Sequence, residues 1–225
     1  MTLKFTLGIF FSSLTVIVTL LNVIISVPVY RLAFVDRKST VYIIAFFNVI
    51  TDLIQLATTG LFLSASMVAD RYLFTGERVN TSSIIIGGLF IGAWFMECLI
   101  QIVMAINRFT VITLNKQHIF TYNITLVMFV FLTLITVFSA LCTQYLFPCC
   151  KFIMDQNLFT FLFDPVEGMY SYSNGMNVSY DVSCTVISTL CYIGVFNSIR
   201  KTKVAASSKV LCSKRRQDSR LVASC

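Results

Sequence analysis

Long apolar runs alternate with short polar stretches along the chain, and this pattern predicts helices that cross a membrane. The hydrocarbon core of a bilayer, roughly 30 Å thick, requires about 20 helical residues. Five runs reach or approach that length, at residues 5–30, 41–69, 84–106, 124–146 and 182–199. The pattern therefore predicts an all-α fold, a polytopic bundle of five transmembrane helices.

Polar side chains recur inside the second and third runs at helical spacing. Steps of three and four residues keep such side chains on one face of a helix. An ionisable group in a membrane helix costs roughly 2.5–3.5 kcal/mol on insertion scales, so both faces are expected to point at other helices. The second run carries Asn48, Asp52, Gln55 and Thr59, and the third carries Trp94, Glu97, Gln101, Met104 and Arg108.

The composition excludes a soluble domain. The chain is 57% hydrophobic and only 12% charged, whereas soluble domains carry about 25% charged residues. The net charge of +7 lies near the ends of the apolar runs, where it indicates membrane topology and not a nucleic-acid partner. We find no nucleotide-binding loop, paired-cysteine zinc spacing or nucleophile elbow. We therefore expect neither an enzyme nor a metal site.

The distribution of Lys and Arg predicts the orientation. If the N-terminus is outside, the segments facing the cytoplasm hold 13 of these residues and the outer segments hold 4, as the positive-inside rule favours. This arrangement gives a multi-pass protein of the plasma membrane with a bundle at residues 1–199 and a basic cytoplasmic tail at 200–225. It also places the sequons of Asn80 and Asn177 outside, where we expect glycosylation.

Three polar residues are predicted to share one depth in the bundle. Counted along the helices, Asn22, Asp52 and Glu97 lie about 12, 16 and 14 Å from the inner ends of their runs. We expect them to form one hydrogen-bonded intramembrane cluster. Two close carboxylates do not both stay ionised without a cation. The cluster is therefore either purely structural or a site for a sodium ion or a proton.

Two further features are predicted on opposite sides of the membrane. The long segment between the fourth and fifth runs contains alternating Phe159, Phe161 and Phe163, as in a strand, and loops of this length often act as lids or binding loops. Arg108 lies at the inner end of the third run. It either marks the membrane border by extending to the interface or provides a docking point for a cytoplasmic partner.

Several motifs resemble those of a known family. Asn22, Asp52 and the triplet Asn107-Arg108-Phe109 are similar to landmarks of rhodopsin-like G-protein-coupled receptors. The variant Ile106-Asn107-Arg108-Phe109 is similar to the nematode serpentine chemoreceptors of the class-x branch. Three further stretches resemble that branch: Gly87 to Trp94, Cys149-Cys150 and Lys214 to Val222.

The resemblance implies a chemosensory receptor. Its small odorant-type ligand would bind in the outer half of the bundle below the phenylalanine lid, Asp52 would belong to a sodium site, and Arg108 would contact a heterotrimeric G protein. The usual cysteine at the outer start of the third helix is missing. By the same resemblance, we expect Cys149 or Cys150 to pair with Cys184 instead.

The chain ends where a sixth receptor helix is expected to begin, so we expect a five-helix product that does not signal alone.

Two other classes of function stay open. A small membrane transporter or channel subunit would use Asp52 and Glu97 as a cation or proton path. A tetraspanin-like organiser is suggested by Pro148-Cys149-Cys150 in a large outer loop.

Overall fold

The computed structural model describes the backbone of residues 3–73, 78–116, 119–164, 166 and 168–222, with side chains as far as residue 202. Its helical elements are α1 (Leu3–Tyr30), α2 (Thr40–Thr58), α3 (Ala65–Ala69), α4 (Thr81–Ile112), α5 (Tyr122–Leu141) and α6 (Tyr172–Val222). Three π-helical segments extend or join them: η1 (Arg31–Val35), η2 (Thr59–Ser64) and η4 (Cys142–Leu146). Two strands, β1 (Phe152–Asp155) and β2 (Thr160–Phe163), follow η4.

Within these described ranges, five helical spans are long and apolar enough to cross a membrane, which confirms the predicted number. They cover Leu3–Val35, Thr40–Ala69, Thr81–Ile112, Tyr122–Leu146 and Tyr172–Thr202. The mostly helical architecture agrees with the predicted fold class, and β1 and β2 add one antiparallel hairpin to it.

Capping residues explain where the helices begin and end. Ser39 caps α2, as its position before the second run suggests, and accepts a hydrogen bond from the N–H of Val41. Helix α4 begins at Thr81, three residues before the predicted apolar run. Asn80 caps it, because its Oδ1 accepts a hydrogen bond from the N–H of Ser83 at 2.8 Å. Ser171 accepts from the N–H of Asn174, so α6 begins ten residues before the predicted fifth run. Asn115, at φ 53°, lies just beyond the end of α4.

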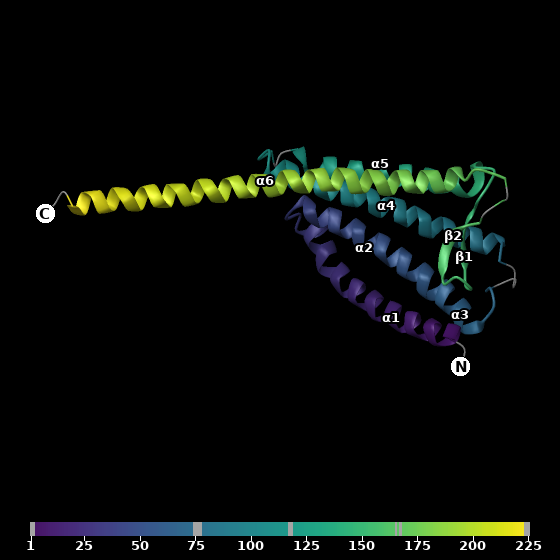
Figure 1. Ribbon diagram of the computed structural model, residues 1–225. Coiled ribbons are helices and arrows are strands. Elements are labelled where there is room, and N and C mark those ends of the chain that lie inside the picture. The colour runs from purple at the N-terminus through teal and green to yellow at the C-terminus, as the bar shows by residue number, and fades with distance from the viewer. Residues whose placement is uncertain (1–2, 74–77, 117–118, 165, 167, 223–225) are drawn as a thin grey trace.

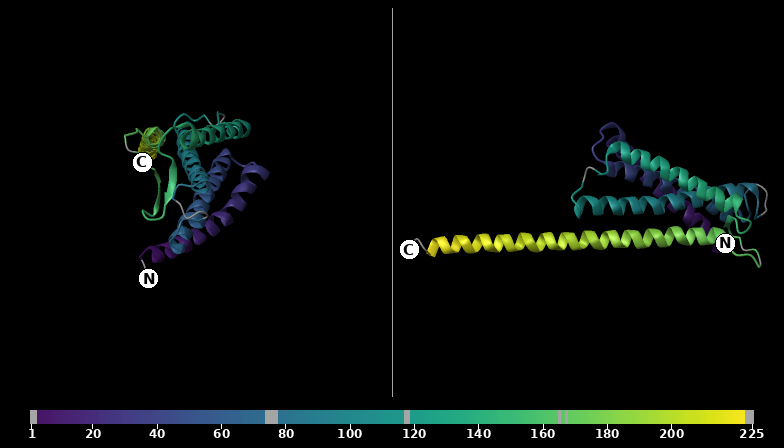
Figure 2. Two further views of the ribbon diagram at one scale, coloured as in Figure 1. Left: turned by 90° about the vertical axis from the view of Figure 1, so that its right-hand side faces the viewer. Right: turned by 90° about the horizontal axis from the view of Figure 1, so that it is seen from above.

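Helix α4 is the central element of the bundle. It contacts α2, α5, α6 and β1. Helix α6 runs alongside it, as Figures 1 and 2 show. Helix α1 is peripheral and packs on α2 and α3, with Gly8 as its buried residue. Polar side chains along α1 are compatible with this position, because Ser13, Asn22 and Ser26 donate to carbonyl oxygens of α1 itself.

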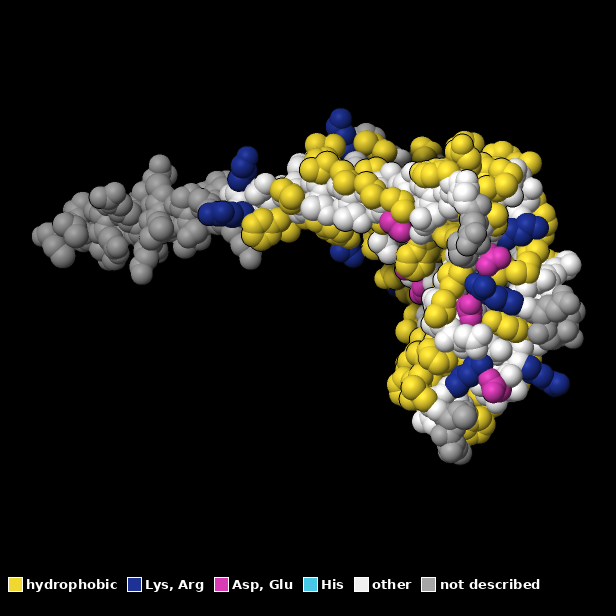
Figure 3. Space-filling view, turned by 45° about the vertical axis from the view of Figure 1, so that its right-hand side comes forward, with side chains coloured by type: hydrophobic (Ala, Val, Ile, Leu, Met, Phe, Trp, Pro, Cys, Tyr) yellow, Lys and Arg dark blue, Asp and Glu magenta, His cyan; other side chains and the backbone are white. Residues whose placement is uncertain are grey.

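The two ends of the bundle differ in the side chains that they present. The hairpin and the start of α1 lie at one end, here called the hairpin end (Figure 1). Charged side chains gather there, whereas apolar side chains cover the flanks (Figure 3). The opposite end, here called the Arg108 end, is where α4 finishes. The Lys and Arg count predicts that the hairpin end faces outside.

Candidate ligand-binding site

The hairpin lies against α4, and two residues fix its position. A Cβ at Gly87 would collide with the carbonyl oxygen of Phe152, so only glycine admits the backbone of β1 here. The buried Gln144 donates from Nε2 to the carbonyl oxygens of Phe152 (2.8 Å) and Ile84 (3.1 Å), and its Oε1 accepts from the N–H of Phe152 (3.1 Å). Phe152 pairs with Phe163 at a position where the ladder leaves its backbone groups pointing away from β2. Gln144 therefore takes the place of a neighbouring strand.

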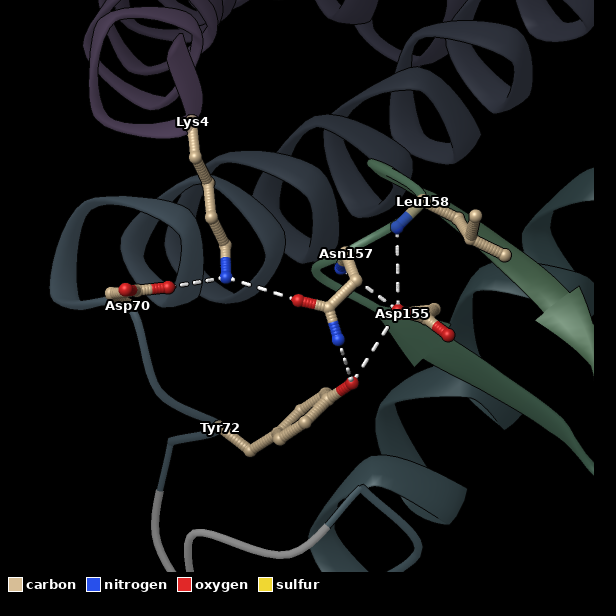
Figure 4. A network of polar contacts seen from close by, with 6 residues as sticks. All are labelled: Lys4, Asp70, Tyr72, Asp155, Asn157 and Leu158. Carbon is tan, nitrogen blue, oxygen red and sulfur yellow. Dashed lines mark hydrogen bonds and ion pairs between the residues drawn. The ribbon is translucent and has the colours of Figure 1, made fainter. Parts of the chain in front are cut away.

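A polar network joins the hairpin turn to the start of α1 and to the segment that follows α3 (Figure 4). Lys4 of α1 forms an ion pair with Asp70 and donates to Oδ1 of Asn157 at 3.2 Å. The hydroxyl of Tyr72 donates to Oδ1 of Asp155 at 3.4 Å. The same carboxylate oxygen accepts from the N–H groups of Asn157 (2.8 Å) and Leu158 (3.3 Å). The turn is thus bound to α1 and to the segment that follows α3.

Arg78 completes this network, because it contacts both ends of the hairpin. Its Nε lies 3.1 Å from Oδ2 of Asp155, and its terminal nitrogen lies 3.3 Å from Oδ1 of Asp164. Asp155 is buried, so the guanidinium compensates a charge that would be costly alone. Burial, and next the negative charge of Asp155, raise the pKa of Tyr72 above its ordinary value. Tyr72 is therefore held as a neutral hydrogen-bond donor.

A cavity of about 410 Å³ lies below the hairpin. Four separate parts of the chain line it: η2, α4, the hairpin and α6. Half of its lining residues are aromatic, and the polar aliphatic ones are two threonines and one asparagine. The lining residues are Thr59, Leu63, Phe90, Ile91, Trp94, Phe152, Phe159, Thr160, Phe161 and Asn177.

The three phenylalanines expected as a lid divide between two places. Phe159 and Phe161 line the cavity, and the ring of Phe161 stacks on Phe90 with centroids 4.4 Å apart. Phe163 is absent from the lining and packs edge-on against Phe152 at 4.9 Å. The strand alternation begins only at Thr160, because Phe159 lies in the turn with φ 57°.

Trp94 and Asp181 connect α4 to α6 beside the cavity. The indole Nε1 of Trp94 donates to Oδ1 of Asp181 at 3.0 Å, and Nδ2 of Asn177 donates to Oδ2 at 3.3 Å. The thiol of Cys98 approaches the same carboxylate at 3.6 Å. Neutral donors therefore hold Asp181, and it takes part in none of the ion pairs found among the described residues.

The predicted intramembrane cluster of Asn22, Asp52 and Glu97 is not formed as expected. Glu97 accepts from Nε2 of Gln55 on α2 at 2.8 Å, so one polar contact between the second and third spans is present. Asp52 accepts from Asn48 within its own helix. Asn22 donates to the carbonyl oxygen of Val18, one turn earlier in α1. Equal depth did not bring Asn22 into the cluster, because depth says nothing of the direction in which a helix turns its side chains.

The predicted disulfide to Cys184 is wrong. Cys149 and Cys150 are bonded to each other, and Cys184 is a buried free thiol that donates to Oε1 of Gln101 at 3.4 Å. The hairpin separates the two places. Cys150 leads directly into β1, whereas Cys184 lies three turns into α6 facing α4.

The motif Asn107-Arg108-Phe109 has three different environments. Asn107 is buried, whereas Arg108 is exposed and lies over the ring of Tyr192 at 5.9 Å. Phe109 occupies the space that a side chain at position 194 would need, so Gly194 allows α6 to approach α4 closely. The motif therefore joins the two helices and leaves a guanidinium facing outward.

The two predicted glycosylation sites lie in helical surroundings. Asn80 caps α4, and its Oδ1 is engaged by the N–H of Ser83. Asn177 lies in the second turn of α6, where its amide donates to Asp181. Asn177 was predicted to lie in a loop, because the predicted fifth helix begins at residue 182 and α6 begins at Tyr172.

Gln144, Arg78 and Asp181 are residues of the candidate site that sequence reasoning missed, and Gly87 was noted only as part of a motif. A glutamine within an apolar run is as informative as a carboxylate, since a buried amide needs partners, and this signal was available for Gln144. Ser171 followed by Asn174 is a possible helix start that would have moved Asp181 into α6. No local signal identifies Arg78, because both its partners come from a distant hairpin.

Comparisons with known proteins agree with this geometry. The model of the family described as serpentine type 7TM GPCR chemoreceptor Srx matches residues 19–223. The crystal structure of squid rhodopsin is similar in fold, with a TM-score of 0.73 and 18% sequence identity. That match covers 94% of this chain and 60% of the squid chain, so the chain spans about 60% of that protein's length. A search of curated protein sequences finds no match.

Proposed function

Because the chain belongs to the serpentine chemoreceptor family Srx, we propose that it acts in the plasma membrane as a chemosensory receptor that binds a small odorant-type molecule in the cavity below the hairpin. The family is one of G-protein-coupled receptors. It therefore favours a receptor over the transporter and tetraspanin alternatives that the sequence left open, and over an enzyme.

The cavity is the observation that supports ligand binding. Its volume of about 410 Å³ lies within the range of roughly 300–1,000 Å³ that small-molecule sites occupy. Aromatic walls with a few polar groups suit a compact, largely apolar molecule. Since η2, α4, the hairpin and α6 all contribute lining residues, a bound ligand would contact four segments at once and change how they sit together.

The Arg108 end supports coupling to a G protein. Arg108 is exposed, and the ion pairs formed among the described residues do not include it. Arg200 and Lys201 of α6 are exposed too. A cationic surface of this kind suits an acidic cytoplasmic partner, and we propose the heterotrimeric G protein in that role.

Asp52 and Glu97 support a secondary proposal, a proton or sodium ion bound between α2 and α4. The partners that the structure gives these carboxylates are neutral amides, Asn48 for Asp52 and Gln55 with Gln101 for Glu97. A proton on one of them, or a cation beside both, would remove the cost of two like charges in the membrane.

The chain contains a single tryptophan, Trp94, and it lines the cavity. Its fluorescence is therefore a direct reporter of occupancy. We would reconstitute the full chain in lipid nanodiscs and titrate small volatile alcohols, ketones and amines. A ligand of the cavity is expected to change the Trp94 emission in a saturable way, and Phe161→Ala is expected to weaken that response at least tenfold by removing the ring stacked on Phe90.

Phe131→Ala is the matched control. Phe131 is a lipid-facing phenylalanine of α5, 62% exposed and outside the cavity. The proposal is contradicted if no compound gives a saturable change, or if Phe131→Ala weakens the response as much as Phe161→Ala does.

A further inference from the structure

Asp181 carries a negative charge that no cation neutralises within the described part of the chain. Its hydrogen-bond donors are neutral groups: the indole of Trp94, the amide of Asn177 and the thiol of Cys98. Asp181 lies within the span Tyr172–Thr202, and a charge in a membrane span is costly without an opposite charge beside it. A cation close to Asp181 would therefore be attracted more strongly than it would be in water.

The cavity below the hairpin is the space that would bring a cation close to this carboxylate. Two of the residues that donate to Asp181, namely Trp94 and Asn177, also line the cavity. Its described lining contains neither lysine nor arginine, so no charge in the wall repels a cation. Lys4 and Arg78, at the hairpin end, form their ion pairs with other carboxylates.

Asn177 adds a hydrogen-bond acceptor to the cavity. An ionised carboxylate can only accept, so Nδ2 of Asn177 must face Asp181, to which it donates at 3.3 Å. This contact fixes the orientation of the amide and leaves its Oδ1 buried, with no hydrogen-bond partner among the described residues. Since a buried acceptor is costly without a donor, Oδ1 is suited to an N–H or O–H group of a bound molecule.

Aromatic rings supply most of the remaining surroundings. Phe90, Phe152 and Phe161 form one stacked group in the wall, with ring centroids 4.4 to 6.0 Å apart. The faces of aromatic rings attract ammonium groups, and the indole of a tryptophan such as Trp94 attracts them most strongly. The same rings bury hydrocarbon well. The wall therefore suits a molecule with one cationic group on an apolar body.

We propose that the molecule bound in this cavity is a small alkylammonium, that is, a protonated primary or secondary amine on a compact apolar body. Its N–H would donate to Oδ1 of Asn177, its charge would compensate that of Asp181, and its hydrocarbon would lie among the rings. A neutral alcohol could use the amide oxygen but would leave Asp181 without a counterion. The inference rests on the chemosensory function proposed above and adds the charge of the ligand to it.

The test compares cyclohexylamine with cyclohexanol, because the two are similar in size and shape and differ in charge near neutral pH. Affinities for the full chain in lipid nanodiscs are measured by isothermal titration calorimetry, with the heat of protein-free nanodiscs subtracted. Wild type is expected to bind the amine at least about tenfold more tightly than the alcohol. Asp181→Asn keeps the size of the side chain and removes its charge. It should weaken amine binding about tenfold and alcohol binding by less than about twofold.

Asn177→Leu removes the acceptor, so it should weaken both ligands about fivefold, because both donate a hydrogen bond. Ser179→Ala is its matched control, since Ser179 is exposed and its loss removes the glycosylation sequon while the amide of Asn177 is kept. Asp36→Asn is the matched control for Asp181→Asn. It removes the same charge from a carboxylate that pairs with Arg31 at the far end of α1. Both controls should leave the ratio of amine to alcohol affinity unchanged.

Equal affinity of wild type for the two ligands would overturn the inference and leave the chemosensory proposal standing, because the cavity would still bind a small molecule. This comparison also decides the question if Asp181→Asn does not fold. Equal loss of amine and alcohol affinity in Asp181→Asn would overturn the inference too, since a purely structural role affects both ligands alike. Failure of every alcohol, ketone and amine to bind would overturn both proposals.

Discussion

The hairpin end of the bundle combines apolar packing with polar contacts between distant segments, whereas the half nearer Arg108 is held mainly by apolar packing. At the hairpin end, Gln144 and Arg78 each bind groups that lie far away in the sequence. The apolar core of the other half consists of Ala33, Ile43, Ile44, Met96, Ile100, Val103 and Phe129.

This difference has consequences in a bilayer. Lipid tails are as apolar as leucine, so apolar packing between helices gains mainly van der Waals contact. A polar group left without a partner in the protein interior costs much more. A few polar residues at the hairpin end are therefore expected to control the structure more strongly than any single apolar residue of the core.

Gln144→Leu should give the largest effect. It removes three hydrogen bonds and leaves the N–H and carbonyl of Phe152 buried without that partner, a cost of about 3 kcal/mol. Amide hydrogen exchange at residues 152–163 should accelerate, and the thermal midpoint should fall. Tyr145→Phe, at the next position, should leave both unchanged. Equal exchange in wild type and Gln144→Leu would show that the hairpin does not depend on this side chain.

Phe129→Ala is expected to cost less, about 2 kcal/mol. Phe129 is fully buried and stacks on Phe47 with centroids 4.4 Å apart. Such a truncation costs about 3–5 kcal/mol in soluble proteins, but the part due to transfer from water is absent in a bilayer. Thermal unfolding in nanodiscs measures the difference, and Phe131→Ala on the lipid-facing side should have almost no effect. A loss larger than that of Gln144→Leu would reverse the comparison.

The smallest expected effect is a pH dependence at Tyr72. Burial and the charge of Asp155 raise the pKa of Tyr72 in the folded protein above 10.0. The stability that it contributes is therefore fully present below about pH 10 and is lost as pH rises through the raised pKa. The free energies of unfolding of wild type and Tyr72→Phe, measured by thermal unfolding, should converge in that range by less than about 1 kcal/mol. Parallel curves would mean that Tyr72 titrates alike in both states.

The sequence predicted the spans because hydrophobic length is a local property. All five spans are present in the described structure. The predicted ends of the helices were less accurate than their existence, and the reason is physical. Polar first turns, such as the turn of α6 that contains Ser173 and Asn174, carry no apolar signal although they are helical.

The site was harder to predict because its parts come from distant segments. Counting along helices gave Asn22 the same depth as Asp52, but it could not give the rotation of α1, which directs Asn22 to Val18. Gly87 was recognised within a motif without its reason. That reason is the approach of the Phe152 carbonyl, which belongs to a hairpin 65 residues further along the chain.

The disulfide of adjacent cysteines has a consequence for chain entropy. A bridge from Cys149 or Cys150 to Cys184 would have closed a loop of about 35 residues and restricted the unfolded chain by roughly 3–4 kcal/mol. The bond between Cys149 and Cys150 closes no such loop. Among the described residues, noncovalent contacts therefore hold the hairpin over the cavity, and breaking them would leave the covalent connectivity of the chain unchanged.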